Sequence, residues 1–443
     1  MKRKLLVLTL VLFVLLLLVS AAFLFLLNAA AEPAQDEGLS DSEDAPEPTP
    51  LQTLSPSPEP VSAPTPVPQG AAAQLKLTLD APQNASSALL DGNLYTDYTF
   101  PGGTTLSLSA DGEICVLYVI FGTYPGSWTL RSGEAEQPCG QDGFLHECVF
   151  LDRPGANVEL VLPDEDVMIR DIYAFSEGYL PPYVQTWHNI REDEGADILL
   201  FATHYDDELL FFGGLIPYYS AVRGLRVQVA YMTSNYLTDF SNYRFRPHEA
   251  LDGLWAAYTH CYPVTNEVPD RECYGYWDAV DIYGIDSFVA YQVEQIRRFK
   301  PLVVVTHAES GEYGHGAHIL TAYSVERAVE AAADPEQFPE SAARYGVWDT
   351  PKTYLHLYGD WSKSTMLNYE LIAPELGLRS PFQVAQDAYR RHVTQQQWVG
   401  FYVCGYDHPH DSHRFGLYRS LVGPDEERND LMEHVSREAF PIG

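Results

Sequence analysis

The sequence has little positive charge and few cysteines. Its 443 residues include 27 Lys and Arg against 61 Asp and Glu, so the formal net charge is −34. A negative field of this size repels phosphate backbones, and we expect no binding to nucleic acid. The 6 cysteines are too few for a disulfide-based scaffold, and no two of them have CxxC spacing. Apolar residues make up 46% of the chain, which is ample for two folded domains and rules out wholesale disorder.

The N-terminus combines basic residues at Met1–Lys4 with an apolar run at Leu5–Leu27. The 23 residues of this run match the ~20 of a membrane-spanning helix better than the ~7–15 of a signal-peptide core. We therefore predict an N-terminal membrane helix within residues 1–31, with a signal peptide cleaved near Ala29–Ala31 as the alternative. In both cases the rest of the chain is expected to be extracytoplasmic, either tethered to the membrane or secreted.

Residues 32–70 differ sharply in composition from the rest of the chain. Their 39 positions include ten prolines and eight acidic residues but no basic or aromatic residue. No core can form from such a segment, and its prolines favour extended conformations. We predict a linker that holds the folded part away from the membrane.

Residues 71–180 contain stretches typical of short β-strands. Thr105–Ser109, Cys115–Phe121 and Val167–Phe175 are examples, and turn signals such as Asp111–Gly112 separate them. This pattern predicts a small all-β sandwich.

The layout of this region resembles the discoidin or galactose-binding jelly rolls, through Ala88–Gly92 and Ile169–Phe175. Trp128 and Tyr124 are therefore candidates for stacking on a sugar, although an aromatic residue in a sandwich more often belongs to the core. Sandwich architecture alone does not decide between the two interpretations.

The expected location outside the cytoplasm permits disulfide bonds. Cys139 and Cys148 flank a predicted hairpin, and Cys261 and Cys273 bracket a polar loop. We therefore predict that each pair forms a disulfide.

Residues 190–443 alternate between buried strands and helices. The predicted strands are Asp197–Ala202, Arg226–Met232, Pro301–Val305 and Thr353–Tyr358, and the predicted helices are Arg246–Tyr258, Ser287–Phe299 and His315–Ala332. Continuous apolar strands alternating with helices indicate an α/β domain with a Rossmann-like parallel sheet covered by helices. No GxGxxG follows the first strand, which argues against a dinucleotide-dependent enzyme.

Polar clusters directly follow two of these strands. Thr203–Glu208 comes after the first strand, and Thr306–His318 comes after the third. Ligands of open parallel sheets bind beyond the carboxyl ends of the strands, so we expect the two clusters to meet in one crevice.

The two clusters contain a donor set that suits a catalytic metal ion. His204, Asp207 and His318 supply two imidazoles and one carboxylate, which fits zinc with one position left for water; the same set also suits iron(II). A zinc-bound water has a pKa of about 7. Asp206 is the candidate general base for that water, and His315 is the candidate acid or oxyanion partner.

The same residues also have purely structural interpretations. Asp206 and Asp207 could cap the helix that follows them. A His-x-x-His pair such as His315 and His318 is by itself more typical of an exposed helix face. The metal site is favoured because both clusters follow strands of one domain.

Over about Asp197–Thr394 the sequence resembles the PIG-L or LmbE-like zinc-dependent N-deacetylases. The family's Ala-His-Pro-Asp-Asp-Glu motif corresponds to Thr203–Glu208, and its Gly-Glu-Tyr-Gly-His-x-x-His motif corresponds to Gly311–His318. The start of a family helix, Arg-x-x-Glu, corresponds to Arg246–Glu249.

This resemblance implies a role for each matching residue. It implies zinc binding by His204, Asp207 and His318, with Asp206 as the base, His315 as the electrostatic or acid partner, and Tyr313 polarising the substrate carbonyl. Tyr205 departs from the family because it replaces a proline, and the turn loses a fixed φ angle. We expect metal binding to survive this change, and a Tyr205 side chain that reached the pocket would alter substrate choice.

Two further features lie towards the C-terminus. Asp407–His413 has His-x-His-x-x-His spacing within a proline-containing loop. We interpret it as an exposed or pocket-rim loop, with a second metal site as the less favoured alternative. Most of the tryptophans in this half of the chain are expected in the core, although exported glycan enzymes often expose some; they are Trp255, Trp277, Trp348, Trp361 and Trp398.

We predict an exported zinc-dependent hydrolase, with iron(II) as the alternative metal, that removes acetyl groups from N-acetylated amino sugars. The expected partners are an N-acetylglucosamine-containing glycan or glycoconjugate and, through the N-terminal helix, the membrane. One alternative is the same metal centre acting on another amide or ester conjugate. The other is an inactive surface protein that binds glycans. The sequence predicts no oligomeric state.

Overall fold

The computed structural model describes residues 70–236, 243–398, 400–406 and 408–442. The predicted membrane helix and all of the predicted linker except its last residue lie outside these residues, and both stay predictions. Among the described residues, no helix is both long and apolar enough to cross a membrane. All described residues belong to one compact unit, Pro66–Gly443.

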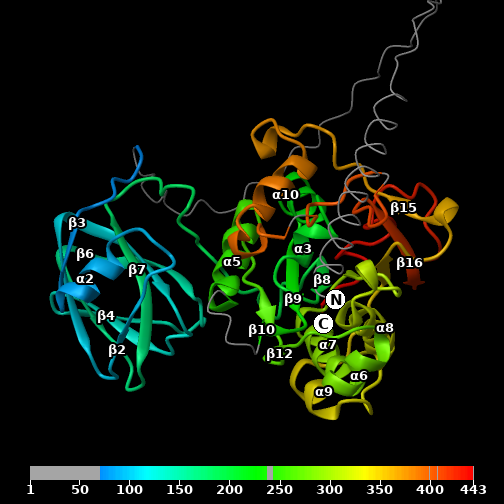
Figure 1. Ribbon diagram of the computed structural model, residues 1–443, viewed down its shortest axis with the longest axis horizontal. Helices are drawn as coiled ribbons and strands as arrows, with labels where there is room; N and C mark the ends of the chain where they lie inside the picture. The colour runs from blue at the N-terminus through cyan, green and yellow to red at the C-terminus, as the bar shows by residue number, and fades with distance from the viewer. Residues whose placement is uncertain (1–69, 237–242, 399, 407, 443) are drawn as a thin grey trace, which may run out of the picture. The chain divides into compact units, whose positions relative to one another are not determined.

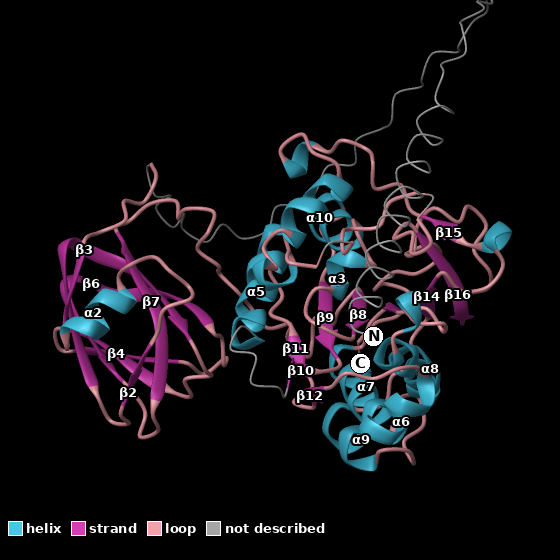
Figure 2. Ribbon diagram, viewed as in Figure 1, coloured by secondary structure: helices cyan, strands magenta, loops and turns pink. Residues whose placement is uncertain are grey.

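The first seven strands form one continuous antiparallel sheet (Figures 1 and 2). They are β1 (Leu77–Asp80), β2 (Tyr98–Phe100), β3 (Thr105–Phe121), β4 (Trp128–Ser132), β5 (Ala135–Cys139), β6 (His146–Val161) and β7 (Val167–Phe175), with helix α2 (Gln83–Leu89) between β1 and β2. The strand order is β2-β7-β3-β6-β4-β5, and β1 pairs with β3.

Strand β3 corrects one expectation from the sequence. The turn signal Asp111–Gly112 does not end a strand, because β3 runs through it for 17 residues. Its register against β6 shifts between Ser109 and Ile114. A bulge of this kind absorbs residues that do not fit the pairing and bends the strand without ending it.

The packing of the core of this sheet tests the predictions of a sugar-stacking tryptophan and of a disulfide. Trp128 is only 2% exposed and packs in the core, so it is not a sugar-stacking residue, whereas Tyr124 is 60% exposed. The predicted disulfide between Cys139 and Cys148 is wrong, because Cys139 packs in this core and Cys148 packs against a separate apolar cluster around Tyr118.

The second predicted disulfide is also wrong. All six cysteines lie in the described part of the chain and are free thiols. Cys261 has its Sγ 3.7 Å from Nε2 of His188. Cys273 packs instead beside Gly316, at the start of a helix.

The second sheet, which begins at Ile198, also has seven strands, in the order β11-β9-β8-β13-β14-β16-β15. These are β8 (Ile198–Ala202), β9 (Val227–Tyr231), β11 (Val264–Thr265), β13 (Val303–Thr306), β14 (Lys352–His356), β15 (Thr365–Met366) and β16 (Arg414–Ser420). The five strands from β11 to β14 are parallel, and β16 is antiparallel to β14 and β15. The four predicted strands are confirmed, whereas β11, β15 and β16 were not predicted.

Helices cover both faces of this sheet (Figure 1). Ile198 and Leu200 of β8 pack on the face that carries α5 (Arg246–Ala256) and α10 (Pro381–Tyr389). The alternate residues Leu199 and Phe201 pack on the face that carries α7 (Ile285–Phe299) and α8 (Gly316–Ala331). This alternation explains why the sequence of β8 is apolar throughout.

The strand order places a switch point between β8 and β13. The chain leaves β8 for β9 on one side and returns later to β13 on the other side. In open α/β sheets the crevice for ligands lies at such a point, beyond the carboxyl ends of the two strands. The two polar clusters of the sequence begin there.

A chain of buried hydrogen bonds connects the first sheet to α5. Nε of Arg170 donates to Nε2 of His248 at 3.0 Å, so Nδ1 of His248 carries the proton and donates to Nε2 of His146 at 2.9 Å. Nδ1 of His146 is 3.1 Å from the Tyr118 hydroxyl. Because His248 lies two residues after Arg246, this chain holds the beginning of α5.

Both histidines of this chain should make folding sensitive to acid. Burial lowers the pKa of His146 to about 3 and holds the pKa of His248 well below its ordinary value. Below about pH 6.5 the unfolded chain binds protons that the folded protein excludes. The contribution of these two imidazoles to the free energy of unfolding should therefore decrease as the pH falls, by up to ~1.4 kcal/mol per pH unit for each.

Urea unfolding between pH 8 and pH 5 measures this slope. The variant His146→Gln retains a donor and an acceptor but does not titrate, so its slope should be smaller by about one proton. His434→Gln, at an exposed position, is the control and should keep the wild-type slope. Equal slopes in wild type and His146→Gln would contradict the prediction.

Candidate active site

The first cluster forms a sharp turn between β8 and α3 (Asp207–Leu210). Asp206 has a φ of 125°, a conformation that residues other than glycine rarely adopt. The turn returns the chain on itself, so that Oδ2 of Asp207 accepts a hydrogen bond from the backbone N–H of His204 at 2.7 Å. Strain of this kind is typical of functional sites.

Three donor atoms converge beside this turn. Nδ1 of His204 lies 3.1 Å from Oδ2 of Asp207 and 3.1 Å from Nε2 of His318, and the third side of the triangle measures 3.2 Å. All three residues are buried. The structure thus brings together the three predicted metal ligands, from the turn after β8, from α3 and from α8.

Carboxylates contact the outer nitrogens of both histidines. Asp270, on the two-residue strand β12 (Pro269–Asp270), has its Oδ1 3.3 Å from Nε2 of His204. Glu312 has its Oε2 2.9 Å from Nδ1 of His318. An ionised carboxylate only accepts, so the outer nitrogen of each histidine carries a proton, and the inner nitrogen is the one that can bind a metal ion beside Asp207.

The carboxylate of Glu312 also contacts two further histidines. Its Oε2 lies 2.6 Å from Nδ1 of His307, and its Oε1 lies 2.7 Å from Nδ1 of His356. Burial opposes ionisation of Glu312, but its contacts with His307, His318 and His356 hold its pKa well below the ordinary value. His307, His356 and Asp270 were not predicted to be site residues.

The donor set suits a cation. Donor atoms 3.1–3.2 Å apart are close to the ~3.3 Å separation of ligand atoms around tetrahedral zinc with bonds of about 2.0–2.1 Å. Burial alone would lower the pKa of His204, yet Asp270 and Asp207 raise it to about 10. The site therefore attracts positive charge, and a divalent metal ion would supply it.

Asp206 lies beside this triangle and lines the same cavity. Its Oδ1 accepts a hydrogen bond from Nη2 of Arg246, the first residue of α5, at 3.1 Å. Burial raises the pKa of Asp206 to about 6, against the opposing effect of Arg246. Asp206 is thus a carboxylate close to the metal site that is not itself part of the triangle.

His315 differs from the expectation in two respects. It immediately precedes α8 as the N-cap residue, whereas a position in the first turn was predicted. Burial, together with His318 and His204, lowers its pKa to about 2, so the imidazole is neutral, which does not suit the role of acid. His315 lines the cavity, and its Nδ1 is buried without a hydrogen-bond partner among the described residues.

Tyr313 and Tyr205 lie in contrasting places. Tyr313 is 51% exposed and lines the cavity. Tyr205 is buried away from the cavity, where its hydroxyl donates to Oγ1 of Thr265 at 3.2 Å and its ring packs on Tyr231. The replacement of the family's proline therefore fills the core and does not reach the substrate.

The cavity has a volume of about 630 Å³. Its lining consists of His204, Asp206, Asp207, Leu210, Arg246, Asp270, Arg271, Glu272, Tyr313, His315, Gln395, Gln397, Trp398 and Phe401. Trp398 is 52% exposed, so its expected place in the core was wrong. His410, from the second histidine cluster, accepts a hydrogen bond from the backbone N–H of Tyr313 at 3.2 Å, in agreement with a pocket-rim loop.

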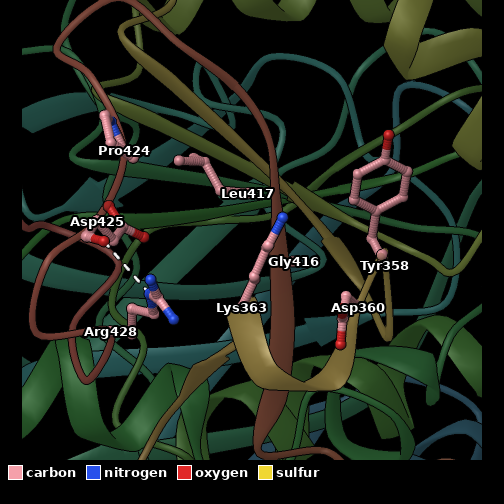
Figure 3. A pocket seen from close by; sticks show the side chains of 9 residues that line it. Tyr358, Asp360, Lys363, Gly416, Leu417, Pro424, Asp425 and Arg428 are labelled. Atoms are coloured by element: carbon pink, nitrogen blue, oxygen red, sulfur yellow. Dashed lines mark hydrogen bonds between the residues drawn. The ribbon is translucent and has the colours of Figure 1, made fainter.

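A smaller cavity of about 260 Å³ lies beside β16 (Figure 3). Asp425 and Arg428 line it on one side and Tyr358 on the other. Asp425 is already bound by the Lys352 ammonium and the Tyr354 hydroxyl. None of the predicted site residues lines this cavity.

Comparison with protein families identifies the region that carries the site. Residues 199–329 match the family described as "PIG-L: GlcNAc-PI de-N-acetylase". This segment is a PIG-L domain. It contains the three donors of the triangle, Asp206, Tyr313 and His315, whereas the cavity wall from Gln395 to Phe401 lies beyond it.

The chain is similar to parts of two curated proteins. A 1D-myo-inositol 2-acetamido-2-deoxy-alpha-D-glucopyranoside deacetylase of Geodermatophilus obscurus is 40% identical over 79 residues, which are 18% of this chain and 24% of the relative. A mycothiol S-conjugate amidase of Streptomyces coelicolor is 35% identical over 100 residues, which are 22% of this chain and 33% of the relative. The matches thus span a quarter to a third of these relatives.

Among solved structures, the N,N'-diacetylchitobiose deacetylase of Pyrococcus horikoshii is similar at 16% identity with a TM-score of 0.35. That match covers 46% of this chain and 72% of the other.

Asp270 should contribute to metal affinity without being a ligand. The charge of Asp270 orients His204 and makes its imidazole more basic. The variant Asp270→Asn lacks this charge, so its zinc affinity should be about 10- to 100-fold lower than that of the wild type. Competition with a chromogenic chelator measures this change. His318→Ala, which removes a donor atom, should lose binding altogether, and Asp281→Asn, at an exposed position of α6 (Tyr276–Tyr283), should leave it unchanged.

Proposed function

We propose that this protein is a metal-dependent hydrolase that removes acetyl groups from N-acetylated amino sugars. The observation that carries the proposal is the triangle of His204, Asp207 and His318, of which His204 and Asp207 line the same cavity as Asp206. The names of the curated relatives, a deacetylase and an amidase, support cleavage of an amide C–N bond.

Each group of residues at the site has a different role in the proposed hydrolysis of the amide. A metal ion held by His204, Asp207 and His318 would polarise the carbonyl and lower the pKa of water. Asp206 takes the proton of the water that attacks the carbonyl carbon and returns a proton to the departing amine nitrogen. The products are acetate and the free amino sugar. Arg246 keeps the Asp206 carboxylate in place through the hydrogen bond to Oδ1.

His315 and Tyr313 are positioned for the oxygen that becomes negatively charged. Both line the cavity, and His315 has a buried nitrogen without a partner among the described residues. A neutral imidazole and a phenol donate hydrogen bonds to such an oxygen without carrying a charge in the resting state. This division of roles leaves proton transfer to Asp206.

We further propose that the enzyme acts outside the cytoplasm, tethered by the predicted helix within residues 1–31 and extended on the predicted linker 32–70. The apolar run and the proline-rich composition support this location. A surface polysaccharide or glycolipid would then be a more accessible substrate than a cytosolic metabolite. The similarity to a mycothiol S-conjugate amidase supports a second candidate, an amide conjugate, as substrate of the same centre.

Acetate release from N-acetylglucosamine oligomers by the full-length, zinc-loaded protein tests the proposal. Asp206→Asn should lower kcat by about 10²- to 10⁴-fold, because it removes the proton acceptor, while zinc content stays at the wild-type level. Asp281→Asn serves again as the exposed control. Wild-type activity retained in Asp206→Asn would contradict the role of Asp206, and an inactive, folded, zinc-loaded wild type would contradict the substrate class.

A further inference from the structure

One wall of the cavity comes from a segment that carries none of the catalytic or metal-binding groups. It follows α10 and contributes Gln395, Gln397, Trp398 and Phe401 to the lining. The indole of Trp398 is 52% exposed, and the ring of Phe401 is 42% exposed. Large aromatic side chains are usually buried, so two half-exposed rings at the mouth of a polar cavity point to a ligand.

The wall is held in place by hydrogen bonds. Thr394 donates from its backbone N–H and its hydroxyl to the two carboxylate oxygens of Glu249, at 2.9 and 2.7 Å. Gln396 donates to the carbonyl oxygen of Tyr389 at 3.0 Å. Glu249 lies one turn after Arg246 on α5, so the same helix start positions both the wall and the proposed base.

The wall continues directly into the catalytic groups. The rings of Phe401 and Tyr313 pack edge to face, with 5.6 Å between their centroids. Tyr313 in turn contacts His315 and His318, with ring centroids 5.6 and 5.5 Å away. A sugar whose acetamide group lies at the triangle would therefore have its next ring beside Phe401 and Trp398.

The charge of the cavity limits the ligand class. Among the described residues, its lining includes the carboxylates of Asp206, Asp207, Asp270 and Glu272 but only two arginines, one of which, Arg246, binds Asp206. The whole chain carries a net charge of −34. The carboxylates would repel the phosphate group of a substrate, and the arginines would offset little of that repulsion. Uncharged N-acetylated sugars and cationic amino sugars would not be repelled.

We propose that Trp398 and Phe401 form a subsite for a second pyranose ring of an uncharged oligosaccharide. The inference rests on the proposed deacetylase function and adds the substrate class to it. One apolar face of a pyranose stacks on an aromatic ring, while its hydroxyls reach the polar groups around it. The cavity volume of about 630 Å³ lies within the ~300–1,000 Å³ typical of pockets for ligands of that size. Gln395 and Gln397 of the same segment also line the cavity and add amide groups to it.

Kinetics on matched substrates tests the subsite. The full-length, zinc-loaded protein is assayed for acetate release from N-acetylglucosamine, its β-1,4-linked dimer and trimer, and N-acetylglucosamine 1-phosphate. We expect kcat/KM to rise at least about tenfold from monomer to dimer and to be lowest for the phosphate. Trp398→Ala should lower kcat/KM for the dimer by roughly 10- to 100-fold but change the monomer less than threefold.

Two further variants separate stacking from folding. Trp398→Phe keeps an aromatic face and should restore most of the activity on the dimer. Trp361→Ala removes a tryptophan of similar exposure, 59%, that does not line this cavity, and it should behave as wild type. Equal losses on monomer and dimer in Trp398→Ala, or a preference for the phosphate, would overturn the subsite while the deacetylase function stands.

Binding tests the subsite independently of turnover. Calorimetry on Asp206→Asn should show the trimer binding at least about tenfold more tightly than the monomer, and adding Trp398→Ala should remove that difference. If the wild type releases no acetate from any substrate, the proposed function is wrong. The difference in affinity between trimer and monomer still shows in that case whether the subsite exists. Equal affinity for monomer and trimer would refute it.

Discussion

A single buried carboxylate, Glu312, organises the carboxyl edge of the second sheet. It accepts from imidazoles at the end of β13, in α8 and at the end of β14, so three elements share one negative charge. Removing that charge from water is unfavourable unless each contact is kept, because a buried ion without partners is strongly destabilising. The contacts in turn fix which nitrogen of His318 carries its proton. The metal triangle therefore depends on a residue that does not belong to it.

Asp270 and Arg246 extend the same principle to the other side of the triangle. Asp270 holds the outer nitrogen of His204, and Arg246 holds the Asp206 carboxylate. The proposed base, Asp206, is thus held by a positively charged arginine. The two histidine ligands are held by carboxylates that accept their outer N–H groups. Such preorganisation lets the site stabilise developing charge without rearranging during the reaction.

The local sequence was sufficient to predict the buried strands and the site residues that directly follow them. Buried strands such as β8 and β13 are apolar throughout, and the motif residues from His204 to Asp207 and at His318 follow those strands directly. The long-range partners could not be predicted. Asp270 lies on a two-residue strand, and Trp398 lies in an irregular segment beyond α10, so neither has a periodic or motif signal. Their places depend on tertiary packing, which a single sequence does not encode in any local pattern.

The second sheet ends at both edges in a very short strand. β11 spans Val264–Thr265 and β15 spans Thr365–Met366. Unpaired backbone groups at a sheet edge are a template for pairing with another chain, and a two-residue edge offers almost no length for it. The parallel core strands are thereby shielded from intermolecular β-pairing. For an enzyme that we propose to act outside the cytoplasm, this arrangement provides resistance to aggregation that is built into the fold.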